Sequence, residues 1–280
     1  MNRHAIAATA LIAATAAAAP GLPGQEFEGT ITMRHLSVPV GALHRQTGGE
    51  PDRLFSVELD RLAPVAEQVE NVTMYIKGSR MRTEGFGEAG EGAYMTVDWE
   101  RGIFRTVQPS ERTYLEWSLE DVERMQEEMP DAEPRSENGD DPAVATEPTI
   151  HPLNQTRIVS GIRCDGYEVR TEGSITHAWV TQEHSAALRA FRNFLEQAQR
   201  MNPAEAAGAR APNALVANYG FPMLTQTIHV SRGGRAVGNY SVQEIVSVSP
   251  GSVPDRTFSA PAGYRKMSLA DLREQAGRRQ

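Results

Sequence analysis

The chain has 280 residues, of which 40% are hydrophobic, with a formal net charge of −8 and a single cysteine. This length predicts one large β-rich domain or two small ones, and one cysteine excludes a fold held together by intrachain disulfides. Nucleic-acid binding requires a basic surface, and the sequence shows none, so we expect no nucleic-acid partner.

The first residues, MNRHAIAATALIAATAAAAPG, have the pattern of a Sec-type secretory signal peptide. Arg3 supplies the positive start, residues 5–19 form an alanine-rich apolar run, and the small residues Ala16 and Ala18 predict cleavage after residue 18. The run is too short and too weakly apolar for a transmembrane segment, and no cysteine lies near the cut to carry a lipid. We therefore expect a periplasmic or secreted bacterial protein with one mature domain, residues 19–280.

Short alternating segments joined by tight turns follow in chain order and predict an antiparallel meander. They cover residues 26–38, 71–85, 93–99, 103–108 and 112–117, and residues 39–53 are expected to form an excursion. Residues 85–90, GFGEAG, match the G-x-G-x-x-G pattern of dinucleotide-binding loops. That pattern binds a pyrophosphate only between a strand and a helix, whereas here a second strand follows. We interpret this stretch as a hairpin loop.

The negative charge is concentrated in one segment. Residues 118–129 predict an amphipathic helix with Ser118 as N-cap. Residues 120–147 carry eleven acidic side chains against Arg124 and Arg135, a net charge of −9. Residues 130–155 contain five prolines and few large apolar groups, which predicts a flexible acidic linker inside the domain. Cation or partner capture is the alternative, although the alternating oxygen ligands of a calcium loop are missing.

The second half returns to strands, at 156–170 and 175–181. A helix is predicted over 184–201, with an apolar stripe typical of core packing that includes Phe191 and Leu195. Residues 202–216 are weakly helical or irregular. Two further strands, 223–232 and 239–248, precede an extended tail that ends in a short helix capped at Ser268.

No motif of known catalytic chemistry is present, and we expect no catalytic residue, no metal and no cofactor. His177 and His184 are seven residues apart but lie on different predicted elements, so a shared metal is not expected. Cys164 lies in a predicted strand, and we interpret it as a buried small hydrophobe rather than as a reactive thiol.

Arg80 and Arg82 lie on one face of a predicted strand and have two interpretations. They would contact an anionic headgroup at the mouth of a barrel, or they would pair with Glu84 or a cross-strand acid on a solvent-facing surface.

Several stretches together resemble a family of secreted bacterial proteins described as a domain of unknown function: FEGTITMR, MYIKGSRMRTEG, MTVDWERGIFRTVQPSERTYLEW, IVSGIRCDGYEV, AWVT and VPDRTFSAPAGY. That family is similar to the periplasmic lipoprotein carriers LolA and LolB. The resemblance implies a β-dominated α+β fold, a half-open antiparallel barrel with two or three helices across its concave opening. The helix at 184–201 or the one at 118–129 would then be a lid.

The same resemblance implies a hydrophobic ligand site lined by Met74, Ile76, Trp117, Trp179, Phe191 and Leu195, with Arg80 and Arg82 as headgroup contacts. We expect a non-enzymatic binding or carrier protein for a lipid, an acyl chain or a lipidated polypeptide. The alternative is an envelope interaction or structural module whose barrel is filled by its own side chains. An enzyme would need residues assembled from distant positions, such as His177 and His184.

Overall fold

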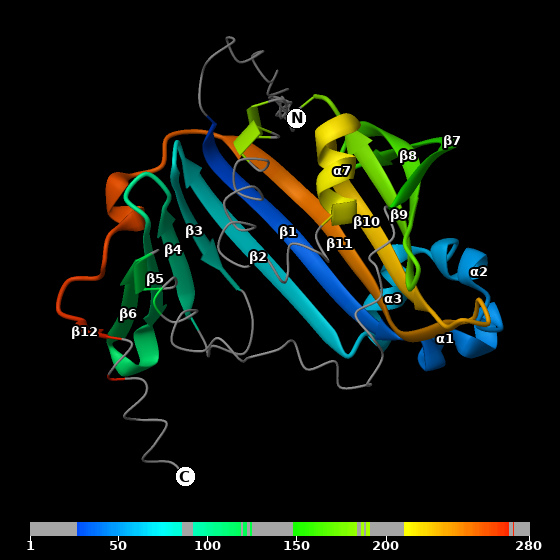
Figure 1. The fold of residues 1–280 in the computed structure, drawn as a ribbon, viewed down its shortest axis with the longest axis horizontal. Helices are drawn as coiled ribbons and strands as arrows, with labels where there is room; N and C mark the ends of the chain where they lie inside the picture. The colour runs from blue at the N-terminus through cyan, green and yellow to red at the C-terminus, as the bar shows by residue number, and fades with distance from the viewer. Residues whose placement is uncertain are drawn as a thin grey trace, which may run out of the picture.

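One open, curved sheet of twelve strands makes up most of the described chain (Figure 1). The computed structural model describes residues 27–85, 92–118, 120–121, 124, 148–183, 186–187, 189–190, 210–268 and 271. The strands lie in the order β12-β6-β5-β4-β3-β2-β1-β11-β10-β9-β8-β7. β7 and β12 form the two edges and do not pair with each other, so the predicted half-open sheet is confirmed and the barrel is not closed.

The strands are β1 (Glu28–Pro39), β2 (Gln68–Lys77), β3 (Arg80–Glu84), β4 (Tyr94–Asp98), β5 (Ile103–Gln108), β6 (Thr113–Ser118), β7 (Thr149–Val159), β8 (Ile162–Arg170), β9 (Ser174–Thr181), β10 (Phe221–Val230), β11 (Ala236–Pro250) and β12 (Arg265–Met267). The α-helices are α1 (Val40–Thr47), α2 (Pro51–Phe55), α3 (Leu59–Leu62) and α7 (Arg210–Asn218), and the 3₁₀ turns are η1 (Ala63–Val65), η2 (Pro109–Glu111) and η3 (Asp255–Phe258).

The predicted meander is confirmed on both sides of β1. β2 to β6 follow one another on one side, β11 to β7 on the other, and β1 joins the two halves by pairing with β2 and β11. Only β12 is parallel to its neighbour, β6. β3 and β4 pair as antiparallel neighbours, as expected for a hairpin around GFGEAG, although residues 86–91 themselves lie outside the described residues.

Between β1 and β2 the chain leaves the sheet, as expected for residues 39–53, and forms three short helices. Leu43, Leu54 and Leu62 are 0–2% exposed and belong to the main hydrophobic core, and each such burial contributes about 2 kcal/mol. Phe55 of α2 packs edge-on against Tyr240 of β11, with ring centroids 6.2 Å apart. These helices are too short to show a helical period, which explains why sequence reasoning missed them.

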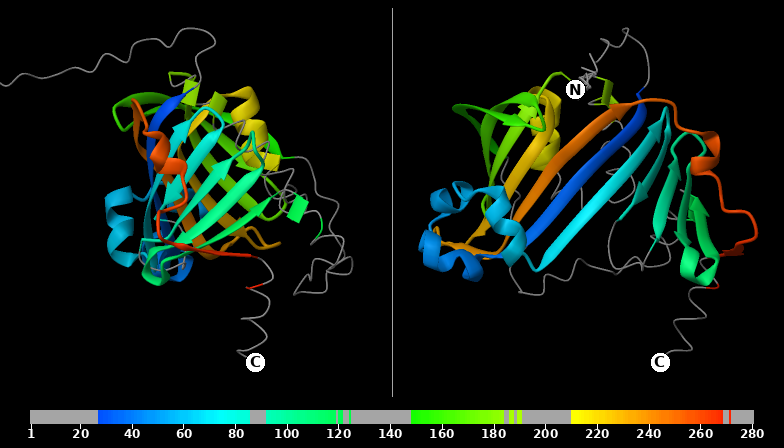
Figure 2. Two further views of the ribbon diagram at one scale, coloured as in Figure 1. Left: turned by 90° about the vertical axis from the view of Figure 1, so that its left-hand side faces the viewer. Right: turned by 180° about the vertical axis from the view of Figure 1, so that it is seen from behind.

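Helix α7 packs on the face of the sheet opposite to α1, α2 and α3, as the rear view in Figure 2 also shows. Its Leu215 joins a second buried cluster with Val169, Ala178 and Val180 of β8 and β9.

β7 begins at Thr149, inside the stretch predicted as an acidic linker, because residues 149–152 pair with β8. Of the part of the chain that the structure describes, no helix is long and apolar enough to cross a membrane.

Several predicted segments lie outside the described residues. They are the signal peptide (1–18), most of the helices at 118–129 and 184–201, and residues 130–147 of the linker.

Candidate ligand-binding face

The cross-strand register divides the side chains of the central sheet between two faces. On one face, a row of successive cross-strand pairs runs from Ile76 of β2 through Met81, Val97 and Phe104 to Trp117 of β6. A parallel row runs through Ile31, Met74, Thr83, Met95, Thr106 and Leu115. We call this side of the sheet the apolar face and the opposite side the charged face.

The apolar face is well buried and combines aromatic with flexible side chains. Ile31 is 0% exposed and Phe104 is 1% exposed. The ring of Phe104 stacks on Trp117 at a centroid distance of 6.0 Å and meets Trp99 edge-on at 5.3 Å. Methionines at several positions add unbranched thioether chains, which adapt to irregular apolar partners. This surface is chemically suited to contact a hydrocarbon chain.

Three of the predicted ligand-contacting residues share the apolar face, and one does not. Met74, Ile76 and Trp117 lie on it. Trp179 of β9 pairs with Leu224, which pairs with Glu244 and then Arg34, and this row lies on the charged face. The structure therefore does not bring Trp179 together with the other three. Phe191 and Leu195 lie outside the described residues.

Arg80 and Arg82 also lie on the charged face, because the two-residue turn at Gly78 and Ser79 pairs Lys77 with Arg80 and Tyr75 with Arg82. Gly78 adopts a φ of +56°, which glycine tolerates without a steric penalty. A ligand lying on Met74 and Ile76 would be separated from both arginines by the sheet itself. The alternation of side chains along β3 after this turn predicts that the arginines lie on the face opposite to Met74 and Ile76.

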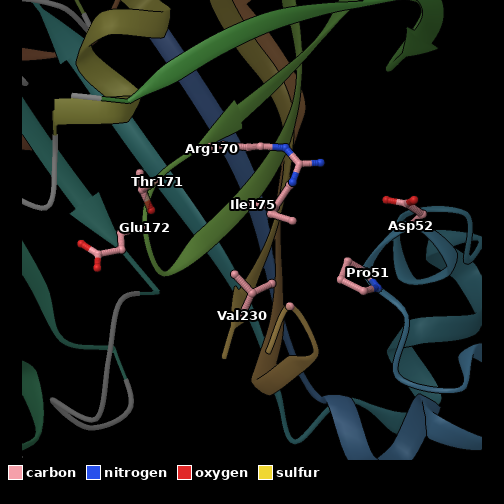
Figure 3. A pocket seen from close by; sticks show the side chains of 8 residues that line it. Pro51, Asp52, Arg170, Thr171, Glu172, Ile175 and Val230 are labelled. Atoms are coloured by element: carbon pink, nitrogen blue, oxygen red, sulfur yellow. The ribbon is translucent and has the colours of Figure 1, made fainter. Parts of the chain in front are cut away.

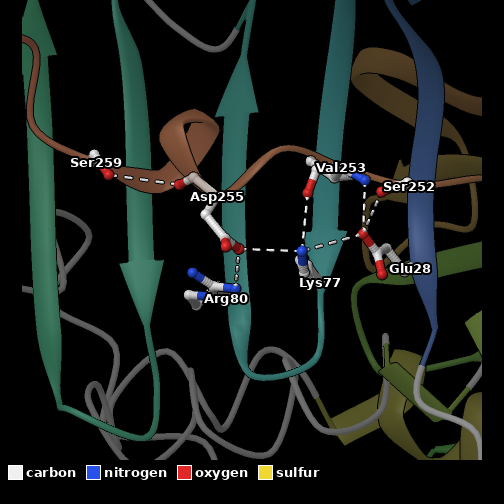
Figure 4. A network of polar contacts seen from close by, with 7 residues as sticks. All are labelled: Glu28, Lys77, Arg80, Ser252, Val253, Asp255 and Ser259. Carbon is white, nitrogen blue, oxygen red and sulfur yellow. Dashed lines mark hydrogen bonds and ion pairs between the residues drawn. The ribbon is translucent and has the colours of Figure 1, made fainter.

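The charged face is crossed by residues 251–264, which we call the C-terminal strap (Figure 4). Lys77 and Arg80 are like charges on paired positions, an arrangement that is unfavourable alone. Asp255 of the strap lies 3.1 Å from the Lys77 Nζ and 2.8 Å from an Arg80 nitrogen. Hydrogen bonds from Arg80 and Lys77 hold the pKa of Asp255 below its usual value.

Arg82 is held in the same way. One of its nitrogens lies 2.6 Å from a Glu84 oxygen, its guanidinium lies 3.5 Å from the Tyr94 ring centroid, and Nη1 donates to the carbonyl of Thr257 at 3.3 Å. Both arginines thus have acidic partners, as in the second of their two interpretations, and both contact the strap.

Sequence reasoning missed a polar group on the apolar face, near the end of β1. His35 of β1 lies beside Glu70 of β2 and Ser241 of β11, and we call these three residues the His35 cluster. The His35 Nε2 shares a hydrogen bond with the Ser241 hydroxyl at 3.0 Å, and the His35 Nδ1 lies 3.8 Å from a Glu70 oxygen. Gln68 donates to the other Glu70 oxygen at 2.7 Å. These residues are far apart in sequence, so no local pattern predicts the group.

A second histidine, His177 of β9, lies on the charged face beneath α2. Its ring stacks on Phe55 at a centroid distance of 3.7 Å, and Nε2 lies 3.3 Å from a Glu168 oxygen. Burial lowers the pKa of His177 despite this carboxylate. Hydrogen bonds from Arg170 hold the pKa of Glu168 low. His184 lies outside the described residues, and no described group of three ligand side chains would hold a metal ion.

A depression of about 440 Å³ lies next to this histidine, between α2, the β8–β9 turn and the β10–β11 turn (Figure 3). Asp52 and Glu172 line it together with Arg170, whose guanidinium is already bound by both oxygens of Glu168. Its lining thus combines both signs of charge with few apolar groups. It offers no extended apolar surface for a ligand, and its arginine is already paired.

Comparison with known proteins adds a family but no activity. No curated protein matches this chain. Among solved structures, two of PNGF-II, in the P21 and C2 space groups, match at 8% and 9% identity with TM-scores of 0.35 and 0.34. They cover 88% and 89% of this chain, which spans about a third of their length, and at these scores neither informs the fold or the function. The model of the family described as a domain of unknown function, DUF4412, matches residues 56–264, and the chain therefore belongs to that family.

Proposed function

We propose that this protein is a non-enzymatic binding or carrier protein for a hydrophobic ligand, in the periplasm or secreted. The observation that carries the proposal is the continuous apolar face of β1 to β6. At about 4.8 Å between strands, the row from β1 to β6 extends over about 24 Å. That is the scale of one extended long acyl chain, and the two rows of this face together offer it aliphatic, thioether and aromatic contacts.

Three further features support the proposal. The sheet is open and curved, as in proteins that hold one apolar ligand against a β surface. The unknown-function family that the sequence resembles is similar to the LolA and LolB carriers, and this similarity bears on the kind of cargo. The N-terminal sequence has the features of a signal peptide, which would bring the protein to the bacterial envelope, where lipids and lipidated polypeptides need carriers.

The second candidate function is an envelope interaction or structural module with a filled interior. The near-complete burial of Ile31 and Phe104 favours it, because these side chains are already removed from water without a ligand. In that case the apolar face would be an ordinary core, and exposed parts of the sheet would contact a protein partner.

Native mass spectrometry of the mature protein, purified from a bacterial periplasm without detergent, distinguishes the two functions. The carrier function predicts a bound mass that matches a lipid recovered by organic extraction of the same sample. It also predicts uptake of added fatty acid by the delipidated protein. A bare polypeptide mass together with no uptake of fatty acid or lipopeptide would refute it and favour the filled module.

A further inference from the structure

The His35 cluster is the polar end of the same surface that carries the proposed apolar site. His35 and Met33 are two residues apart on β1 and point to the same side, about 7 Å from each other. Beyond Met33 lie Ile31 and, on β2, Val72 and Met74. The apolar face therefore changes from hydrocarbon to hydrogen-bonding groups within one step along the central strand.

The cluster is accessible. The side chains of His35 and Glu70 are 27% and 21% exposed, and Gln243, directly opposite His35 on β11, is exposed. Ser37 pairs with Ser241 and accepts a hydrogen bond from Asn239 at 2.9 Å, which extends the polar surface along β1 and β11. A ligand group would find several hydrogen-bond donors and acceptors here without displacing a buried side chain.

The charges on the apolar face favour an uncharged ligand group over an anionic one. Every lysine and arginine of strands β1–β6 and β9–β11 lies on the charged face: Arg34, Lys77, Arg80, Arg82 and Arg105. Glu70 is the one acidic side chain that the same strands place on the apolar face. An anionic group bound there would meet a carboxylate and no lysine or arginine, whereas a hydroxyl group would donate to that carboxylate.

We propose that the His35 cluster binds the hydroxylated, uncharged headgroup of a single-chain amphiphile whose acyl chain lies on the apolar face. This inference rests on the proposed carrier function and specifies its ligand. Glu70 accepts a hydrogen bond from one headgroup hydroxyl, and Ser241 and His35 exchange hydrogen bonds with a second. The headgroup contacts are thus assigned to Glu70, His35 and Ser241, and not to Arg80 and Arg82, which the sheet separates from the chain.

The test compares three probes on the full mature protein: 1-oleoylglycerol, oleate, and vesicles of dioleoylphosphatidylglycerol. Binding is measured by native mass spectrometry and by change in tryptophan fluorescence. We expect oleoylglycerol to bind more tightly than oleate at neutral pH, with no lipid extracted from the anionic vesicles. Glu70→Gln and Ser241→Ala should each weaken oleoylglycerol about tenfold, as for loss of a hydrogen bond to a charged group.

Glu70→Gln has a second expected effect, because removal of the carboxylate removes its repulsion of an anion. Oleate should bind Glu70→Gln at least as well as wild type, an inversion that a general loss of structure would not produce. His151→Gln is the matched control, since His151 is exposed on β7, the edge strand that lies five strands away from β1. It should leave all three affinities unchanged, and thermal melts should show every variant folded.

Three outcomes would overturn the inference. If oleate and oleoylglycerol bind equally and the cluster variants change neither, the carrier function stands and the headgroup assignment is wrong. If no probe binds, both fail together. If oleoylglycerol is cleaved to oleate and glycerol, and Ser241→Ala abolishes the cleavage, then Ser241 is a nucleophile and not a headgroup ligand.

Discussion

The buried hydrogen bond between Tyr240 and Gln226 offers a sharp test of the core beneath α1 to α3. Tyr240 is 0% exposed and Gln226 is 1% exposed, and the Gln226 Nε2 donates to the Tyr240 hydroxyl at 2.6 Å. Tyr240→Phe deletes the acceptor and leaves a buried amide donor without it. A buried polar group deprived of its partner costs about 1–3 kcal/mol, so we expect a loss of about 2 kcal/mol.

Urea unfolding followed by far-UV circular dichroism measures this change in the free energy of unfolding. In a thermal melt, the melting temperature should fall by about 2–4 °C per kcal/mol for a chain of this size. The double variant Tyr240→Phe/Gln226→Met removes both partners and should be no less stable than Tyr240→Phe alone. Tyr75→Phe is the control, because that hydroxyl is only partly buried and lies 3.5 Å from its acceptor on Glu84. A Tyr240→Phe loss below about 0.5 kcal/mol would refute the reasoning.

Three further predictions concern the half of the sheet near β8 and β9. The pKa of His177 is lowered below 6.5, so the unfolded chain binds the proton more readily; the resulting stability is complete above pH 6.5 and is lost as pH falls through the folded-state pKa. Urea titrations at falling pH should show this loss, and His177→Gln should reduce it. Burial raises the pKa of Cys164 to about 11, so a maleimide should not label the native protein at pH 7.5 but should label it in urea; fast native labelling would contradict the burial. A Cβ on Gly166 would lie 2.7 Å from the Trp179 ring, so Gly166→Ala should cost about 1–3 kcal/mol and shift the Trp179 emission, whereas Gly173→Ala, with open space around it, should not.

Much of the sheet was predictable from local pattern. Alternation and turn residues located the strands from β1 to β6 and from β9 to β11 close to their observed bounds, because their side chains alternate between the two faces of the sheet. Cys164 is buried in a strand, as predicted from the usual burial of a free cysteine. The G-x-G-x-x-G stretch lies between antiparallel strands, as the strand that follows it in sequence indicated.

The candidate site was less predictable, because it depends on which strands pair. Arg80 and Arg82 follow Met74 and Ile76 closely in sequence and were expected to contact the headgroup of the same ligand. The register instead puts the two arginines on the face of the sheet opposite to Met74 and Ile76. The two-residue turn between β2 and β3 would have revealed this. His35 and Ser241, by contrast, meet only because β1 pairs with β11, more than 200 residues away, and no local pattern encodes that pairing.

The position of a bound acyl chain tests the central claim most directly. The chain has three tryptophans, of which Trp99 and Trp117 surround Phe104 beside the apolar face, while Trp179 lies on the charged face. Oleic acid brominated along its chain quenches only a tryptophan that it approaches closely. The Trp179→Phe variant should therefore be quenched strongly on binding, and Trp99→Phe/Trp117→Phe, which keeps Trp179 alone, should be quenched little. Equal quenching of both variants, or quenching of Trp179 alone, would contradict the assignment of the apolar face as the ligand site.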